Sequence, residues 1–483
     1  MTEPTPALRG PESIPRGALL ITVASAVFVI SGYAVNVWLG RLLGPEDYGR
    51  FGVVIALITV LNVVQNAAIP QAVARFVAAK SEQPEGILRL GAELQIGVAL
   101  VLTACLVIAA PWISTLLGDD NLVYPLRVIA LVLPAYGIFT LLMAFDNGRR
   151  AYTRQAVTQG TYAVAKAIAS IGLSYPFQLL GAVIGYVVAP LVAIVVGWQR
   201  LWAPRATLGY RSLLGFAGPL SVYALASVGQ LNFDILFVKA MVPGTGAAGF
   251  YAASQNISRI PYFLLTGLAV ILLPAVAAAV TRGGEAVRST SREALRAALL
   301  LVVPPAALIV ATSARLVELV YSESYAPGAG ALSILAIGMG AVALSTVVAS
   351  VVNGIGRAGA TAAVTVGGTA LTLVLCPILI PPFGATGAAL ATTAGGTVSL
   401  VILTLLATSS IPHLIPLASV ARICAASGIV GVAAWLVPAS GFWLVLEYVA
   451  AGLAGAALLV MGGELTARDL RTTLASLRRP TIR

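Results

Sequence analysis

Lys166, Asp234 and Arg259 are charged side chains that lie deep within long apolar stretches of this 483-residue sequence. A charge in the hydrocarbon core of a membrane costs roughly 2.5–3.5 kcal/mol on insertion scales, so such residues mark binding sites or ion pathways by default. The forked donors of Arg259 and the ammonium of Lys166 suit phosphate oxygens. Asp234 could exchange a proton or bind Na⁺, or it could neutralise Arg259 as a structural ion pair, and we favour the ion pair.

Amide side chains form a second candidate set. Asn62, Gln65 and Asn66 follow the i, i+3, i+4 spacing that places side chains on one face of a helix. Uncharged amides along one stripe suit a hydrophilic cavity that hydrogen-bonds the hydroxyl groups of a ligand. For each single residue the alternative is hydrogen bonding between helices, worth about 0.6 kcal/mol per bond. The amides expected to join this cavity from other helices are Gln230, Asn232, Gln255 and Asn256.

The sequence has no pattern typical of catalysis. It lacks a Gly-rich phosphate loop with a lysine, a paired-His metal motif, and a Ser/His/Asp set outside the apolar stretches. Its three cysteines lie within apolar stretches without the spacing of metal ligands. We therefore expect no enzyme activity, no cofactor and no bound metal.

The composition predicts a polytopic membrane protein. Hydrophobic residues make up 59% of the chain, charged residues make up 10%, and the mean hydropathy is +0.96, which excludes a soluble globular domain. The net charge of +11 comes from basic residues in loops, a distribution that argues against nucleic-acid binding. We predict an all-α fold with fourteen transmembrane helices, at about 17–39, 51–70, 92–117, 126–146, 157–177, 181–201, 213–241, 249–280, 298–320, 331–352, 361–381, 385–408, 418–438 and 441–462.

The basic residues alternate from loop to loop. Loops after the second, fourth, sixth, eighth and tenth predicted helices carry Arg and Lys, whereas most of the other loops carry none. By the positive-inside rule both termini are cytoplasmic, in a multi-pass protein of the plasma or inner membrane. Lys239 lies so near the outer end of its helix that snorkelling explains it.

The two halves of the sequence also repeat. Six helices per repeat means that both repeats enter from the cytoplasm, so we predict two six-helix lobes related by a pseudo-two-fold axis along the membrane normal. Three residue pairs indicate the repeat: Gly49 with Gly249 (249 − 49 = 200), Asn147 with Asn353 (353 − 147 = 206) and Gly181 with Gly384 (384 − 181 = 203). The predicted parts are a flexible cytoplasmic tail at 1–16, lobes at 17–212 and 213–408, two additional helices at 409–463 and a basic cytoplasmic tail at 464–483.

A polar motif, GRLLGPEDYG at residues 40–49, joins the first two predicted helices. Gly44 and Pro45 end the first helix, because proline disfavours the α conformation in the residue before it. Two carboxylates then lie where they stabilise the N-terminus of the next helix. We expect an outer loop that caps the mouth of the lobe and does not bind the ligand; its residues are Arg41, Gly44, Pro45, Glu46, Asp47, Tyr48 and Gly49.

With Asp234-Ile235-Leu236, Phe250-Tyr251 and Arg259, this motif resembles the polysaccharide flippases of the multidrug/oligosaccharidyl-lipid/polysaccharide (MOP) superfamily, over the first twelve helices. The resemblance implies a transporter that moves a lipid-linked (polyprenyl pyrophosphate) oligosaccharide from the cytoplasmic to the outer leaflet by alternating access, for cell-surface polysaccharide assembly. Arg259 and Lys166 would then bind the pyrophosphate, and the amides would bind the sugar. The implied partners are membrane lipids, H⁺ or Na⁺ for coupling, and a polysaccharide polymerase or glycosyltransferase.

Three alternatives stay open, and one of them is a scaffold without transport activity within a synthesis complex. A cation-coupled multidrug exporter of the same superfamily requires acidic cavity residues, whereas the candidate cavity residues are mainly amides and bases. An integral-membrane glycosyltransferase or polymerase requires a catalytic carboxylate pair or a large outer loop, and the predicted outer loops are short.

Overall fold

A computed structural model of the protein describes residues 14–66, 69–79, 83–199, 204, 218–244, 246–437 and 439–464. Every regular element in these ranges is a helix, so the predicted all-α class is confirmed. The tails predicted at 1–16 and 464–483 lie almost entirely outside the described residues.

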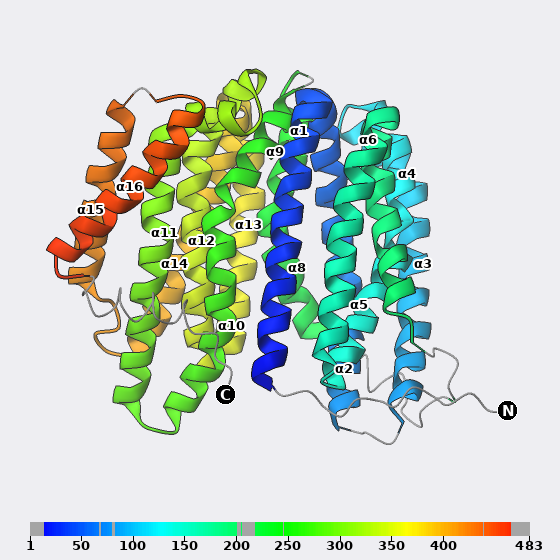
Figure 1. The fold of residues 1–483 in the computed structure, drawn as a ribbon, viewed down its shortest axis with the longest axis horizontal. Coiled ribbons are helices and arrows are strands. Elements are labelled where there is room, and N and C mark those ends of the chain that lie inside the picture. Colours follow the sequence, from blue (N-terminus) through cyan, green and yellow to red (C-terminus); the bar gives the residue numbers. More distant parts are fainter. Residues whose placement is uncertain are drawn as a thin grey trace. The chain divides into compact units, whose positions relative to one another are not determined.

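The chain forms two compact units, Met1–Gly249 and Phe250–Arg483 (Figure 1). The helices of the first unit are α1 (Ile14–Asn66), α2 (Ile69–Ala79), α3 (Pro84–Leu116), η1 (Asp120–Leu122), α4 (Val123–Ala130), α5 (Val132–Gly148), α6 (Tyr152–Val196) and α8 (Gly218–Met241). A further helix, α9 (Ala247–Ser258), begins in the first unit and continues into the second. The helices of the second unit are α10 (Ile260–Val280), α11 (Gly284–Val320), η2 (Glu323–Gly328), α12 (Ala329–Gly354), α13 (Ala358–Phe383), α14 (Ala385–Ser410), α15 (Leu417–Leu436) and α16 (Phe442–Met461).

The boundary predicted between the lobes, at 212/213, stays a prediction. It is a statement about the sequence repeat, whereas the two compact units are defined by packing. By packing, α8 belongs to the first unit, where it contacts α1.

Twelve helical segments of the described residues are long and apolar enough to cross a membrane. Two of them contain the turns that the sequence predicts. α1 has 53 residues with a break at Gly44 (φ 70°, ψ 174°), and α6 has 45 residues with a break at Gln178 (φ 48°, ψ −128°). A membrane-spanning helix needs about 20 residues, so each contains two crossings. Division at these two breaks brings the count close to the fourteen that were predicted.

The break in α1 follows from the local sequence. The positive φ of Gly44 is a conformation that side chains with a Cβ rarely adopt, and a Cβ there would meet no other atom. Pro45, whose missing N–H costs nothing in the first turn of a helix, then starts the second limb. A polar reversal therefore separates two apolar helices, as the motif predicts.

Both units contain the same tight turn, 206 residues apart. The backbone N–H of Arg150 donates to the carbonyl of Asn147 at 2.9 Å, and that of Gly356 donates to the carbonyl of Asn353 at 2.9 Å. Arg150 and Gly356 both have positive φ, at 57° and 88°. The match of Asn147 with Asn353 is therefore one of backbone conformation as well as of sequence.

The predicted match of Gly181 with Gly384 is wrong by three residues. Gly384 (φ 57°, ψ −138°) has the conformation of Gln178, and the structural counterpart of Gly181 is Gly387. A Cβ on either Gly181 or Gly387 would lie about 2 Å from the carbonyl oxygen eight residues earlier, at 1.9 Å and 2.1 Å respectively. The offset is thus 206 here too. The sequence favoured the wrong pair because Gly384 and Gly387 are both followed by Ala, as Gly181 is.

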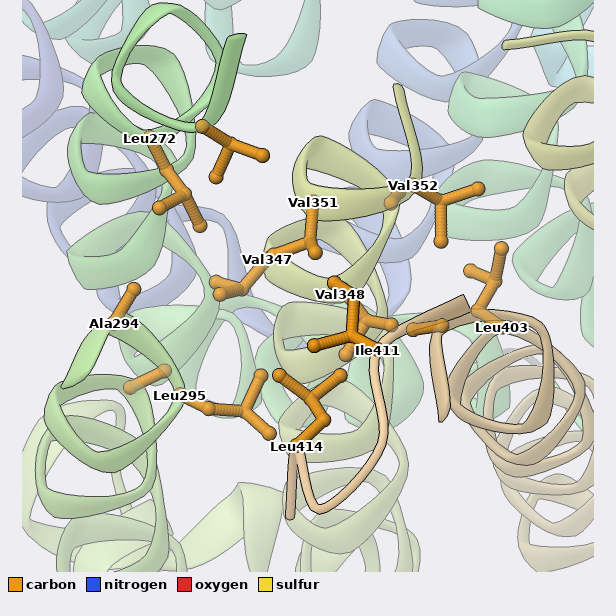
Figure 2. Packing of buried hydrophobic residues seen from close by; sticks show 14 of the residues in the cluster. Leu272, Ala294, Leu295, Val347, Val348, Val351, Val352, Leu403, Ile411 and Leu414 are labelled. Carbon is orange, nitrogen blue, oxygen red and sulfur yellow. The ribbon is translucent and has the colours of Figure 1, made fainter. Parts of the chain in front are cut away.

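The second unit is organised around α12. In the most apolar window of its span 78% of the residues are buried, against 11% for α16, so α12 is central and α16 peripheral. At one end of the unit, Leu272 of α10, Leu295 of α11, Val347 of α12 and Leu403 of α14 pack together (Figure 2). The segment after α14 closes this cluster with Leu414, which is fully buried.

Arg315 of α11 attaches the two additional helices to the second unit. Its guanidinium donates to the carbonyls of Ala434, Val437 and Ala439 at the end of α15, and to the Glu447 carboxylate of α16 at 3.0 Å. The last carbonyls of a helix have no partner within it, so one arginine satisfies several of them. Figure 1 shows α15 beside α11, in orange and green.

Glu464, just after α16, makes a second attachment at the other end of these helices. Its carboxylate pairs with Arg296 of α11 at 2.5 Å and with Arg422 of α15 at 3.5 Å. Its side chain is almost fully buried. The additional helices are therefore held to α11 at both ends.

We expect Arg315→Met to destabilise the protein by about 1–3 kcal/mol, because it leaves the carbonyl of the buried Ala434 and the Glu447 carboxylate without their donor. The measurement is the apparent unfolding temperature in detergent. The matched control is Arg288→Met, which removes an ion pair with Glu285 that is well exposed to solvent and should change stability by no more than about 0.5 kcal/mol. Equal effects of the two substitutions would show that Arg315 does not anchor the helices.

Candidate functional site

Lys166 lies in the first limb of α6, and its ammonium is enclosed by aromatic rings. The Nζ atom lies 4.9 Å from the ring centroid of Phe28, 5.4 Å from that of Tyr186 and 5.7 Å from that of Tyr162. Ring faces attract a cation, by about 2 kcal/mol or more where water is excluded. The residue is 5% exposed, and within the described residues it has neither an ion pair nor a hydrogen bond. Lys166 is thus a buried positive charge without a countercharge.

The Lys166 ammonium borders a cavity of about 460 Å³ in the first unit. Both limbs of α1, both limbs of α6, and α5 and α8 supply its walls. The lining residues are Phe28, Ile55, Ile58, Thr59, Asn62, Val63, Asn66, Val132, Tyr136, Tyr162, Lys166, Tyr186 and Ala224. None of the described residues that line this cavity is Asp or Glu.

The amide stripe of α1 divides between the cavity and the helix packing. Asn62 and Asn66 line the cavity, as predicted. Gln65 does not: it is 1% exposed and donates to Asn62 Oδ1 at 2.9 Å and to the carbonyl of Leu133 on α5 at 3.0 Å. Its role here is to hold Asn62 in place and to tie α1 to α5.

A polar layer behind Asn66 was not predicted from the sequence. Asn66 Oδ1 accepts hydrogen bonds from Thr140 Oγ1 at 2.6 Å and from Gln95 Nε2 at 3.3 Å. Gly137 makes room for the Gln95 side chain, because a Cβ on Gly137 would lie 2.9 Å from Gln95 Nε2. With both donors on its oxygen, Asn66 can direct its amide N–H groups towards the cavity.

The three α8 candidates are all buried in the first unit. Gln230 is 5% exposed, and Asn232 is 9% exposed and donates to the carbonyl of Val228 in its own helix at 2.8 Å. Asp234 is fully buried, and its Oδ1 accepts the backbone N–H of the next residue at 2.9 Å. None of the three lines the cavity around Lys166.

The remaining candidates belong to the second unit. Gln255 is 5% exposed, and Asn256 donates to the Tyr321 hydroxyl at 2.8 Å. Arg259 lies at the break between α9 and α10, before Pro261. Because Arg259 and Asp234 belong to different units, their predicted ion pair stays a prediction.

Arg50, the residue after the polar motif, joins the motif to residues far along the chain by ion pairs. Arg50 binds Glu46 and Asp47 at 2.7 Å and Asp119, in the turn after α3, at 2.8 Å. Lys239 of α8 binds the same Asp119 oxygen at 2.7 Å and is 10% exposed, so the prediction that it snorkels to solvent is wrong. We call Arg50, Asp119 and Lys239 the Asp119 cluster.

The environment of Asp119 keeps its carboxylate charged. Burial opposes ionisation, but hydrogen bonds from Arg50 and Lys239 outweigh it, so the pKa of Asp119 lies below its ordinary value of 3.8. Asp119 is therefore an anion at neutral pH, and it joins two cations of different helices.

A family model described as "Polysaccharide biosynthesis protein" matches residues 38–329, more than half of the chain. The succinoglycan biosynthesis transport protein ExoT of Rhizobium meliloti (strain 1021) is 25% identical over 254 residues, 49% of this chain and 48% of ExoT. Stage V sporulation protein B of Bacillus subtilis (strain 168) is 23% identical over 150 residues, 30% of this chain and 29% of that protein. The chain thus matches no more than about half the length of these curated relatives.

Solved structures share the fold. The lipid II flippase MurJ in an inward closed conformation aligns with a TM-score of 0.75 at 15% identity, over 94% of this chain and 99% of that one. A multidrug resistance MATE family transporter of the MOP superfamily, in an inward-facing conformation, aligns with a TM-score of 0.70 at 15% identity, over 82% of this chain and 98% of that one. At such identities the likeness concerns the fold alone.

We expect Lys166→Met to raise the stability of the protein by about 1 kcal/mol, because the folded state no longer buries an ammonium without a countercharge. The matched control is Lys239→Met, which removes a paired ammonium of similar burial and should lower stability. Both variants are compared with the parent by thermal unfolding in detergent without substrate. A loss of stability in Lys166→Met would show that the lysine serves packing and is not held ready for a ligand.

Proposed function

Since this chain belongs to the polysaccharide biosynthesis protein family, we propose that it is a flippase that moves a lipid-linked oligosaccharide across the membrane by alternating access. The family match confirms the resemblance indicated by the GRLLGPEDYG motif. The multi-pass helical fold agrees with a transporter; ExoT is named as a transport protein and MurJ as a flippase. The substrate, its direction of movement and the residues that bind it are our proposals.

The observation that carries the proposal is the charge of the first-unit cavity. It holds an ammonium without a countercharge, and no carboxylate is among its described lining residues. An anionic ligand would supply the missing charge, whereas a cationic drug would meet repulsion in a site of low dielectric constant. The cavity therefore favours a phosphate-bearing substrate over the alternative, a cation-coupled multidrug exporter with this fold.

The rest of the cavity wall suits a sugar. Tyr136, Tyr162 and Tyr186 present ring faces and hydroxyls, and Asn62 and Asn66 present amides. Apolar rings with a few placed hydrogen-bonding groups are typical of small-molecule sites. We assign the pyrophosphate to Lys166 and the adjoining sugar to the amides.

An apolar cavity in the second unit supports a lipid chain as part of the substrate. It has a volume of about 800 Å³ and is formed by α11, α12, α14 and α15. Val303, Ala307, Ile337, Leu344, Leu400 and Trp435 are among its lining residues. A polyprenyl chain that enters it from the bilayer would exchange contacts with lipid for contacts with apolar side chains, so van der Waals packing would hold it. This assigns α15, one of the two additional helices, a role as part of the wall of a lipid site.

Arg259 and Asp234 enter the proposal in the roles that the sequence suggests. Arg259 would bind the pyrophosphate from the second unit, and Asp234 would serve either as its structural ion-pair partner or as the site of H⁺ or Na⁺ coupling. The amides Gln230, Asn232, Gln255 and Asn256 would contribute to the sugar site in other states of the cycle. We place both termini in the cytoplasm from the charge of the loops, and a polymerase or glycosyltransferase would act on the product.

The test uses proteoliposomes that contain the protein and a polyprenyl pyrophosphate carrying a fluorescent oligosaccharide. Flipping is read as the loss of protection of the fluorophore from a membrane-impermeant quencher. We expect the parent to flip this lipid and not to move ethidium, and Lys166→Arg to retain more activity than Lys166→Met. Ethidium transport by the parent, with no movement of the lipid, would establish the exporter alternative.

Arg259→Ala should slow flipping by about 10–100-fold, the loss expected when a charge-assisted hydrogen bond worth about 1.5–3 kcal/mol is removed. Arg259→Lys should retain part of the activity, because an ammonium still neutralises phosphate but lacks the forked donors. The assay is the same quencher assay, with Arg288→Met as the control. If Arg259→Ala flips the lipid at the parent's rate, Arg259 does not bind the substrate.

A further inference from the structure

The Asp119 cluster joins three segments that are remote in sequence. One Asp119 oxygen accepts from Arg50 Nε at 2.8 Å, in the second limb of α1, and from Lys239 Nζ at 2.7 Å, near the end of α8. The side chains of the three residues are 14%, 7% and 10% exposed. These pairs differ from the ordinary surface type, such as Arg89 with Glu93 on adjacent turns of α3, where both side chains are about 30% exposed.

A backbone contact joins the same segments of α1 and the α8–α9 connection. A Cβ on Gly249, at the start of α9, would lie 1.8 Å from the carbonyl oxygen of Pro45. A Cβ on Gly49 would lie 2.6 Å from the backbone nitrogen of Gly249. Only glycines allow the two backbones to approach so closely. The two glycines that the sequence repeat pairs with each other therefore touch in the structure.

Each residue of the Asp119 cluster is next to, or within about two helical turns of, a glycine that can act as a pivot. Gly44 precedes Arg50, Gly118 precedes Asp119, and Gly244 follows Lys239; their φ angles are 70°, 65° and 108°. A Cβ on any of the three would meet no atom within 4 Å, so their positive φ angles, and not crowding, favour glycine there. Such residues absorb the φ/ψ changes of a hinge.

We propose that these contacts form a gate: residues 45–50 separate from Lys239 and Gly249 during the transport cycle, and Asp119 is the latch that favours the closed state of this membrane face. Ion pairs suit such a latch, because separated charges at the membrane edge are rehydrated, whereas a separated apolar contact would expose apolar surface to water. The proposal rests on the proposed function only in that the cavity must open alternately to the two faces. It does not depend on which substrate is carried.

The test measures access to the cavity, with no substrate present. A reporter thiol is introduced by Thr59→Cys, a residue of the cavity wall, after Cys105, Cys376 and Cys424 have been replaced by Ala. Right-side-out and inside-out vesicles are treated with a membrane-impermeant maleimide, and the labelling rate is measured from each face. The folded state of each variant is checked by its unfolding temperature.

We expect Asp119→Asn to label about tenfold faster than the parent from the face that carries Asp119, the change that follows if opening becomes easier by about 1.4 kcal/mol. Asp119→Glu, which keeps the charge, should label more slowly than Asp119→Asn. The matched control is Glu93→Gln, which breaks the exposed pair on α3 and should leave the rate unchanged.

Two further variants keep the proposal falsifiable if Asp119→Asn does not fold. Lys239→Gln removes one of the two cations of the cluster, and Gly249→Ala prevents the close backbone approach; both should also increase labelling from the same face. Folded variants that label at the parent's rate from both faces would overturn the gate. If the parent does not flip the lipid in the earlier assay, while the variants label as expected here, the proposed substrate is wrong and the gate stands.

Discussion

The cost of placing a charge in hydrocarbon determines where this chain keeps its ionic side chains and how it partners them. At the ends of helices they join segments that are remote in sequence, as Asp119 does with Arg50 and Lys239, and Arg315 with Glu447. The side chains of these pairs are only 7–20% exposed, so each charge depends on its partner to offset the cost of desolvation. The helices are therefore fastened to one another chiefly at their ends, and the apolar middle is left to packing.

Lys166 differs from these paired charges, because it has no carboxylate partner among the described residues. Its ammonium is surrounded by aromatic rings in place of a carboxylate. A carboxylate would stabilise the protein more, but it would also compete with any anionic ligand. A ring face attracts the cation less strongly than a carboxylate does, and it does not compete for the phosphate oxygens of a ligand. We interpret the missing countercharge as stability given up for binding, a common cost at functional sites.

Much of the fold was predictable because hydrophobicity over about 20 residues is a strong signal and because Gly44-Pro45 is a local stop signal. The repeat register was harder. Gly384 and Gly387 are both plausible partners of Gly181, and backbone conformation, which the sequence does not state, decides between them.

Local sequence signals predicted some residues of the candidate site, whereas contacts between residues remote in sequence could not be predicted. Depth within an apolar stretch identified Lys166, and helical spacing identified Asn62 and Asn66. Gln65 is rotated by about 100° from Asn66, which turns it towards α5. Lys239 looked like a snorkelling residue because its partner, Asp119, lies 120 residues earlier, and no local pattern indicates such a contact.

The geometry of α1 connects the site with the proposed gate. Its first limb supplies Phe28 to the Lys166 ammonium, and its second limb supplies Asn62 and Asn66 to the cavity wall and Arg50 to the Asp119 cluster. The two limbs meet at Gly44 and are also joined by a hydrogen bond that the Tyr48 hydroxyl donates to Asn36 Oδ1 at 3.3 Å. A ligand that binds Lys166 and Asn62 together would favour one angle between the limbs, and the position of Arg50 depends on that angle. Ligand binding and gate opening would thus be coupled through one helix, because a ligand shifts a conformational equilibrium only through its different affinity for the two states.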